Sequence, residues 1–441
     1  MFRSLGVPNY RRYFSGSAVG NIGIWTMRTG QAWVVLHLSG GSGAALGLVT
    51  FLQFAPTMLL SVVAGVLADR FDKATLLAIS QGAIGVIGIS LGVLDLNGSL
   101  TLAWVYVLSG LLGLVTALDA PVRQTFSSEL VGPQDVVNAV GLNSASFNVA
   151  RLVGPVVSAL LITLWGTSVV FLLTGLCSVA IVASLVRIDR GALHRERRAP
   201  GRTSWVAGFR YVAGSPVLIG LTVLVALGNA TGANSLQVLL PIVATQVHGG
   251  GALMFGLLCA GLAVGGLAGA LVASAQSGMP RLRRVVGVAL AFGGSLLLVS
   301  ATTSPVALGI CLALVGACFM NLVVMVNTTV QLTPPPSLRG RVVAVYTMFF
   351  LGGGALGSPL LGLLSDHVGP MRAVLTTGVT VVLATVLVTL ALWHARRREP
   401  AREPRTEPAP GGAPCRPARP RRRPRRRAGV IHGNVPTPTA D

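Results

Sequence analysis

The chain has 441 residues, of which 52% are hydrophobic and only 11% are charged, and its formal net charge is +21. Soluble domains carry about 25% charged residues, so the composition excludes a soluble globular protein. The apolar runs are too long and too uniformly apolar for the strands of a membrane barrel, which leaves a helical membrane protein.

Twelve apolar runs follow one another along the chain, each close to the length of about 20 residues that a membrane-spanning helix needs. They lie at residues 14–38, 45–67, 76–94, 100–119, 138–164, 168–188, 215–242, 251–275, 285–302, 304–328, 342–364 and 372–394. No cleavage site follows the first run at the distance typical of a signal peptide, so we expect it to remain as the first membrane helix.

The longest internal polar segment separates the sixth run from the seventh, and this divides the chain into parts. We predict an all-α membrane protein with twelve transmembrane helices in two six-helix halves, an arrangement that suits two halves hinged in the middle. The predicted parts are an N-terminal six-helix bundle (1–189), a basic cytoplasmic central loop (190–213), a C-terminal six-helix bundle (214–394) and an Arg/Pro-rich tail (395–441).

The tail is rich in Arg, Pro, Glu and Gly, and such a segment cannot bury a core, so we expect it to be disordered. Its arginines could bind anionic lipid head groups and so tether the tail to the membrane. The alternative is that the tail is an extension without a role. Interleaved aromatic residues are missing from the tail, so nucleic acid is not an expected partner.

The distribution of basic residues predicts the orientation. With the N-terminus inside, 31 of the 34 Lys and Arg residues fall on the inner side, whereas Arg28 and Arg151 fall inside predicted helices and Arg372 falls outside. The positive-inside rule therefore predicts a multi-pass protein of a bacterial-type cell membrane with both termini in the cytoplasm.

The sequence lacks the residue patterns that several kinds of catalytic and binding site require. A phosphate-binding loop needs Gly-Lys-Ser/Thr, but the only lysine is Lys73 and it follows Asp72, so ATP is not the direct energy source. The six histidines and five cysteines show no ligand spacing, and no acid lies near the middle of a predicted helix. We expect no enzyme activity, no metal and no cofactor.

Polar residues inside the predicted helices are the candidates for a substrate cavity. Arg28 follows Trp25 and Asn21 at helical spacing, and Arg151 follows Asn148 in the same way, so each arginine shares a face with an amide. The candidate set is Asn21, Trp25, Arg28, Gln31, Asn148, Arg151, Asn229, Gln237 and Asn321.

A mid-helix arginine costs about 2.5–3.5 kcal/mol to insert, so each needs a partner or a water-filled cavity. For the amides, hydrogen bonds between helices are the alternative to a place in the cavity. Since no acid lies at membrane depth in the predicted helices, we expect a positive cavity and a substrate with an acidic or polyoxygenated group.

Small residues at four-residue spacing mark surfaces where helices pack closely. We expect the glycine steps at Gly261, Gly265 and Gly269 and at Gly353 and Gly357 to bring helices of the two halves together. The helix-packing candidates are Gly154, Pro155, Gly261, Gly265, Gly269, Gly353, Gly357 and Pro359. Gln124 precedes Pro155 by 31 residues and Gln331 precedes Pro359 by 28, which supports two related halves.

The short charged joint between the second and third runs carries Gly65, Asp69, Arg70 and Lys73. This pattern resembles the loop 2–3 signature of the major facilitator superfamily. The resemblance implies a gate in which Asp69 faces the N-terminus of the eleventh helix and Arg70 pairs with Asp119. Asp119 is also the best candidate for ion coupling, although a purely structural ion pair is an equal alternative.

The resemblance narrows over residues 1–395. Asn9-Tyr10, Asn21-Ile-Gly-Ile-Trp25, Asp69-Arg70-Phe71-Asp72 and Asn148-x-x-Arg151-x-x-Gly-Pro155 are similar to the branch that holds macrolide-efflux proteins and enterobactin exporters. It implies a secondary exporter of a small drug-like or siderophore-like molecule, driven by an ion gradient, with the proton as first candidate. Uptake of a nutrient by the same fold, and a non-transporting membrane sensor or scaffold, are the alternatives.

Overall fold

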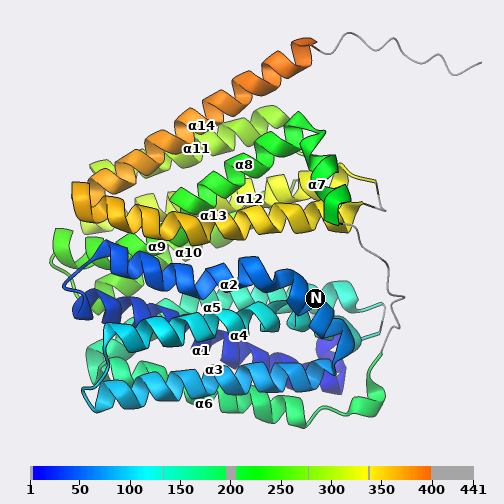
Figure 1. Ribbon diagram of the computed structural model, residues 1–441, viewed down its shortest axis with the longest axis vertical. Coiled ribbons are helices and arrows are strands. Elements are labelled where there is room, and N and C mark those ends of the chain that lie inside the picture. The colour runs from blue at the N-terminus through cyan, green and yellow to red at the C-terminus, as the bar shows by residue number, and fades with distance from the viewer. Residues whose placement is uncertain (1–2, 133, 195–204, 277, 336–337, 399–441) are drawn as a thin grey trace, which may run out of the picture. The chain divides into compact units, whose positions relative to one another are not determined.

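The computed structural model describes residues 3–132, 134–194, 205–276, 278–335 and 338–398. Within these ranges the chain is almost entirely helical and has no strand (Figure 1). Residues Met1–Arg396 form one compact unit, and the predicted tail lies almost wholly outside the described residues.

Six long helices form the first half of the chain. After a short turn of 3₁₀-helix at Arg3–Gly6, they are α1 (Pro8–Leu38), α2 (Gly43–Arg70), α3 (Lys73–Leu96), α4 (Leu102–Glu129), α5 (Val136–Trp165) and α6 (Thr167–Val186). Capping side chains set several of the starts: Ser42 accepts from the Ala45 amide and Asp72 from the Thr75 amide. Gly166, with a φ of +88°, makes the sharp turn between α5 and α6.

The second half begins with short elements and continues as long helices. They are the 3₁₀ turn Arg190–Ala192, α7 (Trp205–Ala213), α8 (Pro216–Thr231), α9 (Ala233–Ile242), a π-helical turn (Val243–Val247), α10 (Ala252–Ser274), α11 (Leu282–Ala301), α12 (Pro305–Leu332), α13 (Arg339–Val368) and α14 (Pro370–Arg398). α8 and α9 belong to one span, Pro216–Val247, which is interrupted at Gly232 because its backbone (φ −106°, ψ −127°) is not helical.

Eleven segments of the described chain are long and apolar enough to cross a membrane. α1 is not one of them although it has 31 residues, because its Asn, Arg and Gln side chains make it less apolar. The prediction of an all-α membrane protein is confirmed.

Two groups of helices make up the bundle. In the first half α1 packs on α5 and α6, α3 on α4 and α6, and α2 on α4; in the second half α10 packs on α12, α8 on α13 and α11 on α12 (Figure 1). The groups meet where α2 lies against α13 and α5 against α10. The loops at residues 39–42, 97–101 and 369 share one end of the bundle, here called the distal end.

Two predicted boundaries differ from the structure. Residues 205–213, expected to belong to the central loop, form α7, which packs on α13: the Phe209 ring meets Phe349 edge-on at 6.4 Å. α4 runs ten residues past its predicted end at 119, to Glu129, so that Arg123 lies within a helix instead of a loop. The charged residues from position 119 onward suggested a loop. The helix continues through them because partners inside the bundle compensate the charges of Asp119 and Arg123.

The glycine stripes have other partners than expected. A Cβ on Gly265 or Gly269 would overlap the carbonyl oxygen of Ala313 or Ala317 in α12, and Gly261 lies against Gly309 of the same helix. Gly353 and Gly357 likewise face Ala226 and Ala230 of α8. The expectation that these stripes join the two halves is wrong, since all of these contacts lie within the second half.

Other small residues join the halves. A Cβ on Gly43 would meet the Gly362 carbonyl, one on Gly47 would meet Pro359, and one on Gly256 would meet Pro155 and Ala159. Pro155 and Pro359 therefore lie at the contacts α5–α10 and α2–α13. Gly154, beside Pro155, instead allows α5 to approach Trp25 and Thr26 of α1 within the first half.

Candidate functional site

A cavity lies beside Trp25, between the two halves. α1 contributes Trp25, Arg28, Thr29 and Ala32 to its wall, because these residues follow one helix face. α2 adds Gln53 and Phe54, and the second half adds residues of α9 and α10. The non-atom space at this cavity is about 580 Å³ with open solvent included.

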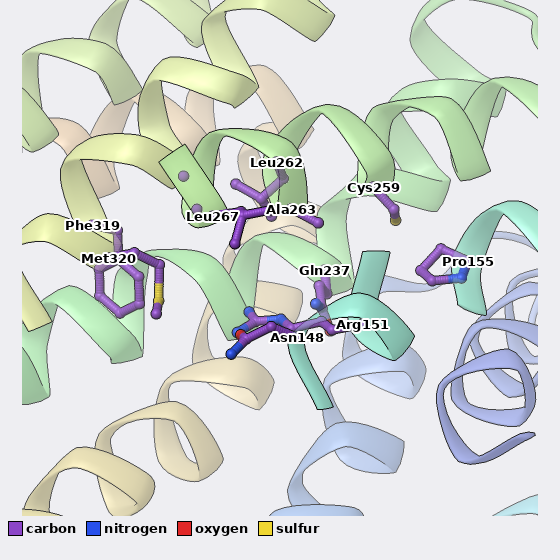
Figure 2. Close-up of a pocket in the computed structure, with 12 residues that line it drawn as sticks. Asn148, Arg151, Pro155, Gln237, Cys259, Leu262, Ala263, Leu267, Phe319 and Met320 are labelled. Atoms are coloured by element: carbon purple, nitrogen blue, oxygen red, sulfur yellow. The ribbon is translucent and has the colours of Figure 1, made fainter. Parts of the chain in front are cut away.

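A second cavity adjoins the first and is shown in Figure 2. α5 contributes Asn148 and Arg151, and α10 and α12 supply an apolar wall that includes Phe319 and Met320. The side chains of Asn148, Arg151 and Gln237 lie close together on one side of the cavity in Figure 2. Pro155, Gln237 and Cys259 line both cavities, so the two form neighbouring parts of one region.

Both predicted membrane arginines reach the ring of Trp25. The guanidinium carbon of Arg28 lies 5.4 Å from the centroid of the Trp25 ring and 4.6 Å from that of Phe54, and the guanidinium carbon of Arg151 lies 5.5 Å from Trp25. Each contact over a ring face stabilises a cation by about 0.5–2 kcal/mol, less than a carboxylate partner would. The ion pairs of the described side chains involve neither arginine.

A third membrane arginine, Arg123, is held very differently. Its guanidinium donates from Nε to Asp119 Oδ2 (3.0 Å) and from NH1 to Ser17 Oγ (2.6 Å), and its NH2 lies 2.9 Å from Asp119 Oδ2 as an ion pair. The Asp119 carboxylate also accepts from Ser80 Oγ (3.0 Å) and Gln81 Nε2 (2.8 Å). This network links α1, α3 and α4.

The expectation that no acid lies deep in a helix is therefore wrong. Asp119 is 7% exposed and lies ten residues before the end of α4, about 15 Å along the helix axis. The Asp119-to-Arg123 spacing of four residues, typical of a pair on one helix face, was the available signal.

The predicted cavity residues separate into two groups. Trp25, Arg28, Asn148, Arg151 and Gln237 line the two cavities. The other four residues line neither cavity. Three of them make hydrogen bonds between helices: Asn21 accepts from Arg123 (3.4 Å), Gln31 accepts from Gln53 (2.7 Å), and Asn229 donates to the Phe350 carbonyl (2.6 Å). The fourth, Asn321, lies partly buried in α12.

The charged joint between α2 and α3 is described in part. Lys73 forms an ion pair with Glu129 at the end of α4, and Asp72 caps α3. The structure does not describe the side chains of Asp69 and Arg70 or the surroundings of Gly65. The predicted contacts of Asp69 with α13 and of Arg70 with Asp119 therefore stay predictions. Within the described residues the Asp119 carboxylate is bound by Arg123 and the side chains of α3.

At the distal end a carboxylate of one half caps a helix of the other. Asp366, near the end of α13, accepts from Ser42 Oγ (2.9 Å) and from the amides of Gly43 (2.6 Å) and Ala44 (3.0 Å) at the start of α2. An acid is favourable there because the first amides of a helix are unpaired and the helix dipole is positive. Nearby, the Trp33 ring stacks on Phe255 at 6.1 Å, α1 on α10.

Two packed groups of membrane helices with adjoining cavities between them define an integral membrane transporter of the major facilitator fold. The chain belongs to the family described as transmembrane secretion effector (MFS_3), whose model matches residues 2–408. The predicted superfamily and branch are confirmed.

Relatives of known function are transporters. The chain is 25% identical over 403 residues to the staphyloferrin A transporter of Staphylococcus aureus, covering 88% of this chain and 96% of that one. It is 27% identical over 376 residues to the enterobactin exporter EntS of Citrobacter koseri, covering 83% and 87%.

Solved structures share the fold. A bacterial homolog of the human lysosomal transporter Spinster, inward-facing and occupied, matches with a TM-score of 0.71 and 15% identity over 87% of this chain and 96% of that chain. A single-residue mutant of the nucleoside transporter NupG matches with a TM-score of 0.68 and 12% identity over 87% and 99%. At these identities the likeness concerns the fold alone.

Proposed function

We propose that this protein is a secondary active exporter of a small siderophore-like or drug-like molecule, driven by an ion gradient, with the proton as the coupling ion. The observation that carries the proposal is the pair of adjoining cavities between the two halves, whose linings together include Trp25, Arg28, Arg151 and Gln237. The similarity to a staphyloferrin A transporter and an enterobactin exporter supports export of a metal-chelating compound.

Alternating access is supported by how the halves meet. Asp366, Gly43 and Gly362 join α13 to α2, and Trp33 joins α1 to α10, all toward the distal end. These contacts close the cavity on that side. The small residues at the contacts let the halves rock with little loss of packing, as the two-half transporters do.

The orientation of the bundle in the membrane is inferred from the charges. The positive-inside rule places the end opposite the distal end in the cytoplasm, because the connections there carry nearly all of the basic residues. The conformation with a closed distal end would then take its substrate from the cytoplasm and release it outside. In the gate, Asp69 would contact the start of α13 and break that contact when the inner side opens.

Asp119 is the proposed coupling residue. It is buried, it is bonded to Arg123, Ser80 and Gln81, and it belongs to the network that links three helices of the first half. Protonation would weaken its pairing with Arg123 and so loosen the contacts between these helices.

The experiment is transport in inverted membrane vesicles with an imposed pH gradient, interior acidic. A catecholate or carboxylate siderophore should accumulate in vesicles that hold the protein, and adding an uncoupler should abolish the accumulation. Asp119→Asn should remove the dependence on the gradient. Accumulation that is equal with and without the protein, or that continues with the uncoupler, would contradict gradient-driven export.

Two other functions are tested in the same preparation. Uptake by the same fold would appear as accumulation in right-side-out vesicles with the opposite gradient. A sensor or scaffold using the basic tail would depend on residues 395–441, which lie almost wholly outside the described chain. We expect a variant shortened after Arg398 to keep its transport rate, with and without anionic lipid in the vesicles.

A further inference from the structure

We propose that Arg28 and Arg151, whose guanidinium carbons both lie within 5.5 Å of the Trp25 ring centroid, form a binding site for a small anion with clustered oxygen atoms of carboxylate or catecholate type. Gln237 of the second half completes the site. The inference rests on the proposed function and names the chemistry of its substrate. It starts from the different ways in which the protein holds its three membrane arginines.

Arg123 shows what a structural arginine looks like in this protein. It has a carboxylate ion-pair partner and a hydroxyl acceptor within 3.0 Å, Asn21 adds a longer contact, its NH2 makes no hydrogen bond, and it is 8% exposed. Arg28 and Arg151 have no ion-pair partner among the described side chains, and their contacts are aromatic faces. A ring face compensates the charge of a guanidinium but leaves its in-plane N–H donors free for another acceptor.

Unpaired donors gather at the same place. Arg28 Nε and Trp25 Nε1 are buried and have no hydrogen-bond acceptor within the described structure. Both atoms can only donate. A buried donor without an acceptor costs about 1–3 kcal/mol, which an oxygen-rich ligand would recover on binding.

The lining residues favour an oxyanion over other ligands. The guanidinium of arginine presents a planar fork of donors that matches a carboxylate or a pair of adjacent oxygens. The residues that line the two cavities include no Asp or Glu, so a cationic ligand would meet two positive charges and no negative one.

The opposite wall requires an apolar part in the ligand. Leu262, Phe319 and Met320 line the cavity across from Arg151 (Figure 2). An amphipathic anion would place its oxygens on the arginines and its carbon skeleton on this wall. Because Gln237 and Cys259 come from the second half, such a ligand would contact both halves at once.

The test measures binding to the purified full-length protein with three probes of known charge: citrate, 2,3-dihydroxybenzoate and tetraphenylphosphonium. At constant ionic strength, citrate or dihydroxybenzoate should raise Tm and change the tryptophan fluorescence of the wild type, and comparison of the two probes separates carboxylate from catecholate recognition. Arg28→Gln and Arg151→Gln should each weaken this binding by about tenfold or more.

Matched variants separate the site from general charge and from folding. Arg372→Gln removes an exposed arginine at the distal end and should bind the anion like the wild type. Arg151→Lys keeps the charge and loses the fork, so it should bind with intermediate affinity. Trp25→Phe keeps an aromatic ring beside both arginines but removes the indole N–H donor, so it should bind the anion with intermediate affinity and lose the fluorescence change.

The site would be overturned if neither anion bound more tightly than the chloride control, or if Arg28→Gln and Arg151→Gln bound the anions like the wild type. It would also be overturned if tetraphenylphosphonium bound equally to the wild type and to Arg151→Gln while the anions did not bind. Gradient-driven transport is scored separately. Anion binding without transport would contradict the proposed export function, but the proposed anion site would stand. Transport of a cation that Arg151→Gln does not affect would contradict the anion site, but the proposed export function would stand.

Discussion

Three arginines inside helices of the first half, of which Arg123 is buried and Arg28 and Arg151 are half-buried, illustrate how one residue type serves two purposes. Arg123 has its counter-ion, Asp119, one helical turn away, whereas Arg28 and Arg151 lie over aromatic rings in the cavities. Burying a charge is tolerable only when another group compensates it. For Arg123 that group belongs to the protein; for the other two we assign it to the substrate.

Asp119→Asn should destabilise the protein by about 3–5 kcal/mol, because the positive charge of Arg123 would remain buried without its counter-ion. The measurement is the Tm of the purified protein in detergent. The double variant Asp119→Asn/Arg123→Gln should lose less than Asp119→Asn alone, since it removes both charges. A double variant that is less stable than Asp119→Asn would show that the pair is not the reason for the loss.

At the scale of elements, glycine determines how closely α10 and α12 approach. Gly265 and Gly269 face the carbonyl oxygens of Ala313 and Ala317, where no side chain fits. Between membrane helices, van der Waals contact of this kind replaces the hydrophobic effect as the source of association. α10 also carries Cys259, which lines both cavities, so its position bears on the site.

Gly265→Ala should lower the stability by about 1–3 kcal/mol, because the added methyl group overlaps the Ala313 backbone. The control is Gly287→Ala in α11, where a Cβ meets nothing within 4 Å. There the change should be neutral or stabilise by up to about 1 kcal/mol, through helix propensity. Equal Tm values for the two variants would contradict the assigned packing.

At the scale of the whole molecule, the Asp366 cap joins the halves at one end of the bundle. One carboxylate satisfies two amides and a hydroxyl at the start of α2. Hydrogen bonds to a charged group contribute about 1.5–3 kcal/mol each, of the same order as the difference between two conformations of a transporter. This contact is therefore well placed to hold the distal side closed.

Asp366→Asn should shift the population toward conformations that are open at the distal end, by about tenfold. Spin labels at Leu38 and Val368, which are exposed at the ends of α1 and α13, would report this as a longer distance. Asp95→Asn is the matched control, because the Asp95 carboxylate accepts from the hydroxyls of Thr167 and Ser168 within the first half. An unchanged distance in Asp366→Asn, or an equal change in both variants, would contradict the role of the cap.

The sequence by itself determined the class, the helical spans and the two membrane arginines of the cavity. Length and apolarity suffice for helices in a membrane, because every backbone group is then satisfied within its own segment. The period of the helix likewise places Arg28 beside Trp25 and Arg151 beside Asn148. These properties depend on neighbours within a few turns of the same chain.

Only the tertiary structure decided which residues pair across helices. The end of α4, the Asp119–Arg123 network and the partners of the glycine stripes were missed because each depends on segments far apart in the sequence. Asn229 looked like a cavity residue and instead bonds the α13 backbone. A buried polar group is satisfied by whichever helix lies next to it, and that neighbour is set by the packing of the whole bundle.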